Sequence, residues 1–416
     1  MRCLALAWVS CSLLTACSPC LCQPPAAPAA APASPAAAPA SPAAANATPN
    51  ANANANAGPA APIHALTEVP EDAIGAASAP VPGFMRGINL GNGLDAPTEG
   101  AWGVVLKPEH FAMAKAAGLD HVRLPVRFSA HALDAPPYTV EDAFFKRVDW
   151  AVDQALAHGL SIIIDLHHYE ELMKKPHDHA ARLTAIWKQI AARYKGRPAT
   201  VAFELINEPC DELKSPELNP ITKQALAAVR ASNPTRTVFV DSYFWASADR
   251  LKELELPEDP NLVPSFHMYQ PILFTHQGMP WMGPEFQSRP VVFPGPPATP
   301  VTPVPAAQSA GWVSAWFSGY NSLPVAQNPG GPKAIFDYFK VVEDYVTSSH
   351  RRVYMGEFGV ADTVDAKSRE NWLRLVKTEA ERRHIGWALW DDGGKFKAMN
   401  IADGSWTPPI QAGLFH

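Results

Sequence analysis

Two glutamates lie in short motifs of polar and turn-forming residues, each placed at the end of an apolar run. Glu208 belongs to Asn207-Glu208-Pro209, and Glu357 belongs to Gly356-Glu357-Phe358-Gly359. One carboxyl group can protonate a departing oxygen, while a second carboxylate attacks or stabilises a carbon that becomes electron-poor. Two acidic side chains that meet across a substrate therefore predict acid/base chemistry combined with nucleophilic catalysis.

Other apolar runs of this chain also end in polar or aromatic residues. These residues are Arg123, Asp165, His167, His267, Tyr269, Trp390 and Asp391. An isolated buried charge is costly, so charges at the ends of so many apolar runs are best explained by a common site.

The apolar runs have the length of buried strands and alternate with amphipathic helical segments. The predicted strands are Met85–Leu90, His121–Pro125, Ser161–His167, Val201–Asn207, Thr237–Asp241, Val263–His267, Val353–Phe358 and Gly386–Trp390. The predicted helices are Glu109–Ala117, Glu141–His158, His179–Tyr194, Thr222–Ser232, Lys333–Ser349 and Ala366–Arg383, with one helical turn at Ala246–Leu251. This alternation is typical of a parallel sheet with crossover helices.

Eight such units predict an α/β fold of the (β/α)8 TIM barrel type, whose active site lies at the carboxyl ends of the strands. A doubly wound sheet is the alternative, but the glycine-rich phosphate loop typical of that fold is missing from the sequence. The segment Thr275–Gly331 is too long for a simple connection and predicts an elaborated loop beside the site, inserted after the sixth strand.

The N-terminal part predicts export. Met1-Arg2 is followed by the apolar stretch Leu4–Leu14, which has the length of a signal-peptide core. Leu14-Thr15-Ala16-Cys17 resembles the lipobox of bacterial lipoproteins, so Cys17 is a candidate for lipidation; ordinary secretion is the alternative. We therefore expect a signal and lipobox region (1–22), an Ala/Pro/Asn-rich disordered linker (23–75) and a catalytic barrel (76–416), either secreted or anchored to the bacterial outer membrane.

Charge and cysteine usage exclude several classes of function. The formal net charge is −6 and no Lys/Arg run is present, so nucleic acid is not an expected partner. Cys210 is the single cysteine beyond residue 22, which excludes a disulfide inside the barrel and a cysteine zinc site. A metal site is the alternative interpretation of the histidines His167, His168, His177 and His179, but no helical His-x-x-x-His pair occurs. We predict no metal and no cofactor.

From about Gly83 to the C-terminus the chain resembles glycoside hydrolase family 5, and specifically its bacterial endoglucanases (cellulases). The resemblance depends on seven motifs in order. They are Gly87-Ile88-Asn89-Leu90-Gly91-Asn92, Arg123-Leu124-Pro125, Asp165-Leu166-His167-His168, Phe203-Glu204-Leu205-Ile206-Asn207-Glu208-Pro209, Ser265-Phe266-His267-Met268-Tyr269, Gly356-Glu357-Phe358-Gly359 and Trp387-Ala388-Leu389-Trp390.

This resemblance implies a retaining, endo-acting hydrolase of β-1,4-glucans such as cellulose, with Glu208 as acid/base and Glu357 as nucleophile. It also implies which residues line the subsite of the cleaved bond: Arg123, His167, Asn207, His267, Tyr269 and Trp390. We expect a monomer. Mannan, xyloglucan or β-1,3-glucan as substrate, and a glycan-binding lipoprotein without catalysis, remain alternatives.

The chemistry requires the two glutamates to differ in pKa. We expect Arg123 and Tyr269 to keep Glu357 ionised, and the charge of Glu357 to raise the pKa of Glu208. Glu204 is expected to point into the barrel and to pair with a cation such as Arg123. Asn207 is a candidate to bind the sugar 2-hydroxyl. Trp390 is a candidate stacking surface, and five further tryptophans are equally compatible with sugar contact or packing: Trp102, Trp245, Trp281, Trp312 and Trp316.

Overall fold

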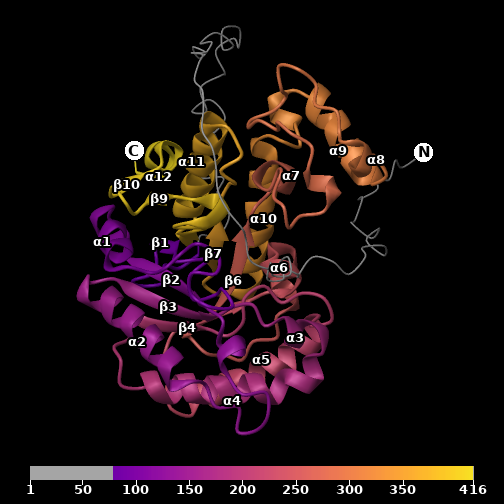
Figure 1. Cartoon of the computed structure of the whole chain (residues 1–416). Helices are drawn as coiled ribbons and strands as arrows, with labels where there is room; N and C mark the ends of the chain where they lie inside the picture. The colour runs from indigo at the N-terminus through magenta and orange to yellow at the C-terminus, as the bar shows by residue number, and fades with distance from the viewer. Residues whose placement is uncertain (1–77, 416) are drawn as a thin grey trace, which may run out of the picture.

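The computed structural model describes residues 78–415, which contain a closed barrel of eight parallel strands (Figure 1). The strands are β1 (Arg86–Asn89), β2 (His121–Val126), β3 (Ser161–Leu166), β4 (Val201–Glu204), β5 (Val238–Asp241), β6 (Leu262–Met268), β7 (Tyr354–Phe358) and β8 (Gly386–Leu389). Pairing of β1 with β8 closes the ring. The predicted TIM barrel is therefore confirmed, and the doubly wound alternative, which requires an open sheet, is wrong.

The six predicted helices are present and cover the outside of the barrel. They are α1 (Pro108–Ala116), α2 (Asp142–Ala157), α4 (Pro176–Tyr194), α5 (Ser215–Arg230), α10 (Pro332–Ser349) and α11 (Ala366–Arg382). In α2, Phe145, Val148, Val152 and Ala155 are buried, and this spacing of three and four residues turns one face of the helix toward the strands.

Several element boundaries differ from the prediction. Helix α5 begins at Ser215 rather than Thr222, because Pro216 lies in its first turn and Pro220 is accommodated inside it. After β5 the chain forms α6 (Tyr243–Ala246) and the 3₁₀ helix η4 (Ala248–Glu253) in place of the predicted turn. Short elements without a strong periodic pattern were not predicted: α3 (Glu170–Lys174), β9 (Met399–Asn400), β10 (Ser405–Trp406) and α12 (Pro408–Leu414).

The barrel interior has two chemically different halves. Toward the amino ends of the strands lies an apolar cluster that is separate from the core under the helices. Its members are Val81, Phe84, Ile163, Ala202, Phe239, Val263, Tyr354 and Ala388. Two residues further along β3, β4 and β5, the buried side chains are Asp165, Glu204 and Asp241, and Arg123 of β2 is buried against the first two. The apolar half is thus a packed floor beneath a charged upper half.

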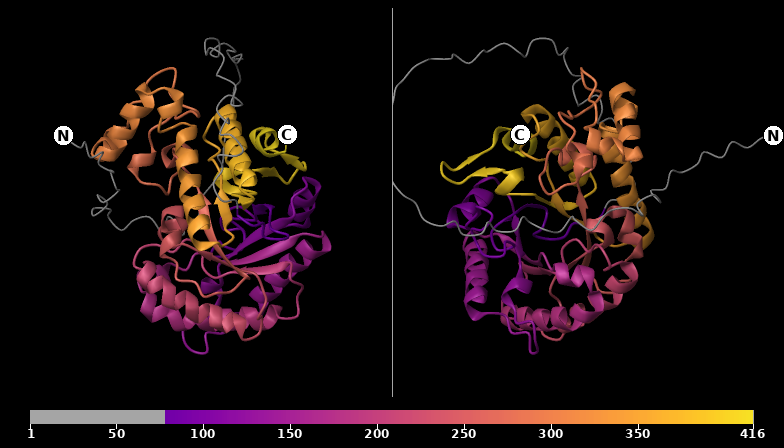
Figure 2. Two further views of the ribbon diagram at one scale, coloured as in Figure 1. Left: turned by 180° about the vertical axis from the view of Figure 1, so that it is seen from behind. Right: turned by 45° about the vertical axis from the view of Figure 1, so that its right-hand side comes forward.

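The segment between β6 and α10 is more ordered than the predicted loop. It contains α7 (Ile272–Thr275), η5 (Pro284–Phe286), α8 (Pro305–Gln308), α9 (Gly311–Ser322) and η6 (Val325–Gln327). Figure 2 shows α8 and α9, in orange, standing out as a lobe beyond the barrel strands. Since this segment leaves the carboxyl end of β6 and returns through α10, the lobe belongs to the side of the barrel that carries the site.

The predictions for the N-terminal part lie outside the described residues. These are the signal and lipobox region, the lipidation of Cys17 and the linker. Within residues 78–415, none of the helices combines the length and the apolar character needed to cross a lipid bilayer.

Candidate active site

Arg123 on β2 is the centre of the upper half of the barrel, and its side chain is fully buried. Its guanidinium donates to both carboxylate oxygens of Glu204, at 2.9 and 2.6 Å, and to Oε1 of Glu357 at 2.8 Å. It also donates to the side-chain oxygens of Asn89 (2.8 Å) and Asn207 (2.7 Å). The expected pairing of Glu204 with Arg123 is confirmed. A rigid guanidinium fork of this kind fixes the geometry of every acceptor around it.

Glu357 points into the barrel because β7 contains an irregularity. Opposite β6, the pairing passes from Phe266–Met355 to His267–Glu357, which leaves Gly356 without a partner across the ladder. A Cβ on Gly356 would lie 3.0 Å from Ser265 Oγ and 3.1 Å from His267 Nε2, so a side chain there would collide with the site. The extra residue brings Glu357 to the inner face, where Tyr269 donates to its Oε2 at 2.8 Å.

Glu208 lies in the loop after β4, four residues beyond the end of the strand, and faces the mouth of the barrel. Its side chain is 28% exposed, whereas that of Glu357 is 5% exposed. Its backbone is in the left-handed region (φ 47°) and its amide donates to Asp241 Oδ2 at 3.0 Å, which holds this strained position. The residue is therefore presented by a fixed turn rather than by a strand.

His267 on β6 connects the two glutamates. Its Nδ1 lies 2.8 Å from Glu208 Oε1 and 3.6 Å from Glu357 Oε2. Oxygens of the two glutamates and a nitrogen of His267 all lie within 4.8 Å of one another. The structure thus brings together the two predicted catalytic candidates, with an imidazole between them.

The charges around His267 keep its ring protonated. Burial disfavours the charged imidazole, but the negative charges of Glu357, Asp241 and Glu208 outweigh it and raise the pKa of His267 to about 9. In return, although burial opposes the ionised form, the hydrogen bond and positive charge of His267 lower the pKa of Glu208. Burial raises the pKa of Glu357, against the positive charges of His267 and Arg123.

The expectation that the charge of Glu357 gives Glu208 the raised pKa is therefore wrong for the unliganded site. Arg123 is not the only cation near the pair, because the protonated His267 is hydrogen-bonded directly to Glu208. The Glu208–His267 pair carries one proton, which a 2.8 Å hydrogen bond allows to move between nitrogen and oxygen.

Trp390 and His167 form one wall of the site. Their rings are nearly parallel, with centroids 5.7 Å apart and an interplanar angle of 5°. The Nδ1 of His167 is hydrogen-bonded to Asp165, and burial lowers the pKa of His167, so this imidazole is neutral. Together with Arg123, Asn207, His267 and Tyr269, all predicted lining residues surround the two glutamates.

The five other tryptophans are distributed differently. Trp102 lies edge-on to His168, with ring centroids 5.4 Å apart, beside the site. Trp316 stacks on Tyr320 at 4.9 Å and 16°, which makes it a packing residue of the lobe. Trp245, Trp281 and Trp312 are 39%, 45% and 45% exposed. The exposed three remain available for a ligand.

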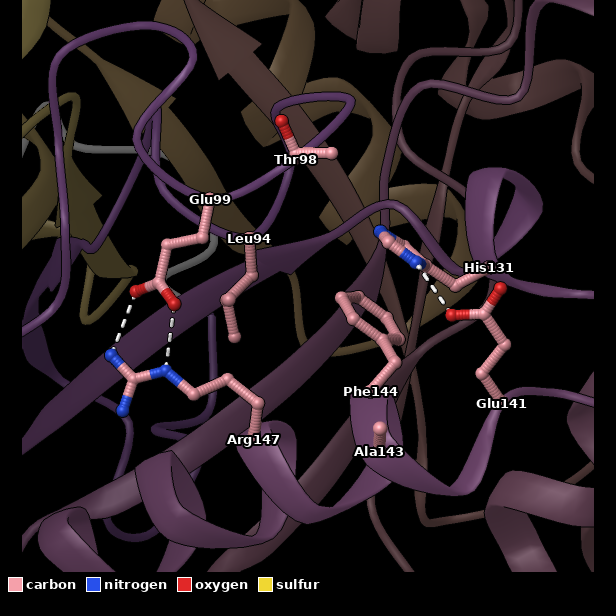
Figure 3. Close-up of a pocket in the computed structure, with 8 residues that line it drawn as sticks. All are labelled: Leu94, Thr98, Glu99, His131, Glu141, Ala143, Phe144 and Arg147. Atoms are coloured by element: carbon pink, nitrogen blue, oxygen red, sulfur yellow. Dashed lines mark hydrogen bonds and ion pairs between the residues drawn. The ribbon is translucent and has the colours of Figure 1, made fainter.

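The loop between β1 and α1 contributes Asp95 and Trp102 to the site and is held from below by α2. Arg147 of α2 donates to both oxygens of Glu99, at 2.8 and 2.7 Å (Figure 3). It also donates to the backbone oxygen of Leu106. Figure 3 also shows the hollow between this ion pair and the pair formed by His131 and Glu141, where the His131 ring lies over Phe144. The residues lining this hollow do not include Glu208 or Glu357, so it is separate from the candidate active site.

Three groups of side chains in the described part of the chain have the residue types and spacing to hold a metal ion. They are Asp95–His167–His168, Glu204–Asp241–His267 and Glu208–His267–Glu357. Two of these include His267, whose proton would have to leave before the nitrogen could bind a metal. The prediction that the protein uses no metal stays a prediction.

Sequence reasoning did not assign roles to three supporting residues. Asn89 accepts from Arg123 and donates to the backbone oxygen of Gly356 at 3.0 Å, which ties the guanidinium to the irregular position in β7. Asp241 holds the Glu208 amide, and burial raises its pKa to about 7, as it does for Asp95. Asp241 is the last residue of β5, so its position at the polar end of a predicted strand could have identified it as a site residue.

Comparison with known proteins identifies a family. The model of the family described as "Cellulase (glycosyl hydrolase family 5)" matches residues 87–395. Endoglucanase H of Acetivibrio thermocellus is 30% identical over 307 residues, which are 74% of this chain and 29% of that protein. The chain thus spans less than a third of the length of this larger relative.

This chain covers almost the whole length of several solved structures with the same architecture. Endoglucanase Cel5A from Thermotoga maritima is 35% identical, with a TM-score of 0.68, over 79% of this chain and 96% of that one. The same Thermotoga enzyme has also been solved in complex with mannotriose. The cellulose synthase subunit Z (CcsZ) of Clostridioides difficile is 33% identical, with a TM-score of 0.67, over 80% of this chain and 100% of that one.

Proposed function

This chain belongs to the cellulase family, glycosyl hydrolase family 5, and we propose that it hydrolyses internal β-1,4-glucosidic bonds of cellulose-type glucans with retention of configuration. The observation that carries the proposal is the position of the two glutamates, whose carboxylate oxygens lie within 4.8 Å of each other across His267. Carboxyl groups about 5–5.5 Å apart suit a covalent glycosyl-enzyme, whereas inverting enzymes need a wider gap for water.

Glu357 is the nucleophile in this proposal. It lies deep in the barrel, and its two oxygens accept from Arg123 and Tyr269, both at 2.8 Å. These donors orient one lone pair toward the anomeric carbon and stabilise the carboxylate as it leaves again in the second step. Burial, which raises its pKa, also makes the ionised oxygen more reactive than a solvated one.

Glu208 is the acid/base. The proton that it shares with His267 protonates the oxygen of the departing sugar, and the resulting carboxylate then takes a proton from the incoming water. The side-chain oxygen of Asn207 is occupied by Arg123, which directs its amide nitrogen toward the sugar 2-hydroxyl. Trp390, backed by His167, offers the apolar face of an indole to the sugar ring.

A panel of substrates tests the proposal. Reducing ends released from carboxymethylcellulose, mannan, xyloglucan and β-1,3-glucan should be highest for carboxymethylcellulose. Glu208→Gln should abolish the release, whereas Glu258→Gln, a change in a fully exposed side chain, should leave it intact. Equal activity of Glu208→Gln and the parent would overturn the mechanism.

Mannan is a second candidate substrate, since Thermotoga maritima Cel5A binds mannotriose. Preference for mannan in the same panel would change the substrate and leave the two-glutamate chemistry in place. Binding to a glucan without any release of reducing ends would instead support a glycan-binding protein.

For the cell, we propose an exported monomer that is tethered to the outer membrane through a lipid on Cys17. The support is the apolar stretch Leu4–Leu14 followed by Leu14-Thr15-Ala16-Cys17. Mass spectrometry of the mature protein should find a diacylglycerol-modified Cys17 at its N-terminus, and Cys17→Ser should release the enzyme from the membrane fraction. A mature chain that begins elsewhere without lipid would favour ordinary secretion.

A further inference from the structure

The lobe formed after β6 has an unusual composition. From Pro290 to Pro332 the sequence contains no Asp, Glu, Lys, Arg or His, although charged residues make up 18% of the whole chain. A surface built from such a segment cannot attract an anionic lipid or a nucleic acid through cations. It suits a partner that is itself uncharged.

The uncharged lobe is a rigid support. Val313, Phe317 and Tyr320 of α9 are buried, and the Tyr320 hydroxyl accepts from the amide of Val292 at 2.7 Å and donates to its oxygen at 3.0 Å. The side chain of Asn328 also donates to the backbone oxygen of Tyr320 at 2.8 Å. One face of α9 is therefore fixed to the rest of the lobe.

The outer face of α9 carries two tryptophans one helical turn apart. Trp316 stacks on Tyr320 and is only partly exposed, whereas Trp312 is 45% exposed. Ala315 and Gly319 add little bulk on this face, so the indole of Trp312 is its most accessible ring, on an uncharged surface. A flat aromatic ring on such a surface matches the apolar face of a pyranose, which carries no charge.

The segment from Met279 to Phe286 links Trp312 with the active site. The ring of Phe286 lies 6.3 Å from that of Trp312. Phe286 follows Met282 closely in sequence, and Met282 packs with Tyr269 and Trp390 against a cluster around Met279. The exposed Trp281 lies within this connecting segment, whose backbone oxygens at Met279 and Met282 accept from Gln287 at 2.9 and 3.3 Å.

On these grounds we propose that the Pro290–Pro332 lobe is a second glycan-binding surface, on which Trp312 binds a distant part of the β-glucan chain whose cleaved bond lies between Glu208 and Glu357. This inference rests on the proposed function. Because the contact is remote from the reacting bond, it favours long chains and leaves short oligosaccharides unaffected.

The test compares Trp312→Ala with the parent on a long and a short substrate. For a soluble cellulose polymer we expect Trp312→Ala to lower kcat/KM by about fivefold to tenfold through KM, the range of one lost stacking contact, and to leave kcat/KM for cellotetraose unchanged. Trp312→Tyr should restore most of the polymer activity. Leu323→Ala, an exposed apolar residue at the end of the same helix, is the matched control and should behave like the parent.

Binding measured without turnover separates the possible failures. In the Glu357→Gln background, retention on insoluble cellulose should fall with Trp312→Ala. A parent that cuts the polymer while Trp312→Ala cuts and binds it equally well overturns the second surface alone. A parent that cuts no β-glucan overturns the proposed function and this inference together. A dimer in sedimentation that Trp312→Ala converts to a monomer would identify the surface as a contact between two copies and also overturn the inference.

Discussion

The two halves of the barrel interior are built on the same strands with opposite chemistry. On β2, His121 belongs to the lower half, where it is hydrogen-bonded to Tyr354 at 2.7 Å next to the apolar floor. Two residues further along, Arg123 holds three buried carboxylates, Asp165, Glu204 and Glu357. The inward positions of a strand thus serve packing at one end and chemistry at the other.

The two halves of the barrel interior affect the stability of the folded state in opposite directions. Burial of rings such as Phe239 and Tyr354 removes apolar surface from water and favours folding. Burial of Asp241 and Asp95, whose pKa values rise to about 7, disfavours the folded state at neutral pH. We infer that the apolar floor stabilises the folded state and offsets the destabilisation caused by the buried charges of the upper half.

The largest difference in kcat between variants of the two halves is expected on β7, where Tyr354 lies in the floor and Glu357 in the charged upper half. Glu357→Gln should lower kcat for carboxymethylcellulose by roughly 10⁴-fold, because the covalent step loses its nucleophile. Tyr354→Phe removes one hydroxyl from the floor and should leave kcat within about twofold. Steady-state kinetics on both purified variants measures this, and a Glu357→Gln enzyme with parental kcat would contradict the division.

A second contrast compares equal losses of stability. Phe239→Ala creates a cavity in the floor, and Arg123→Met leaves buried carboxylates unpaired; each should lower the free energy of unfolding by about 4 kcal/mol. Only Arg123→Met should also lower kcat, because only Arg123 contacts Glu357. Urea denaturation gives the first quantity, and kinetics at a temperature where both variants are folded gives the second. Parallel losses of kcat in both variants would show that the halves are not separable.

The sequence predicted the elements that have strong patterns and missed those that depend on local geometry. Eight apolar runs were sufficient for the strands, since a buried parallel strand is apolar along its whole length. The position of Glu357 was not predictable from alternation, because Gly356 adds an unpaired residue to β7. The protonation of His267 was also not predictable from the sequence, since it depends on three acidic residues that come from other strands and loops.

The pH dependence of activity tests the upper half through His267. The proton of the Glu208–His267 pair should remain until the pH approaches about 9, the raised pKa of His267, so the alkaline limb of kcat/KM should lie near that value. In His267→Asn, Glu208 alone holds the proton, and the limb should move to lower pH by about one unit or more. His121→Asn changes a histidine of the floor and should leave the limb in place. An unchanged limb in His267→Asn would assign the proton elsewhere.

The smallest expected effect concerns stability, and it depends on the sign of one pKa shift. Burial raises the pKa of Asp95 from 3.8 to about 7, so below pH 3.8 the folded and unfolded states are both protonated at this site. As the pH rises to 7 only the unfolded state ionises, and the folded state loses stability until its own carboxyl group ionises as well. Asp95→Asn stays neutral at every pH, so it should stabilise the protein by roughly 2 kcal/mol more at pH 8 than at pH 5.

Asp134→Asn, a change in a fully exposed side chain, should show no such difference in denaturant unfolding at the two pH values. Equal effects of Asp95→Asn at pH 5 and pH 8 would mean that burial does not raise the pKa of this carboxyl group. The buried carboxyl groups of the upper half would then destabilise the folded state less than their burial indicates.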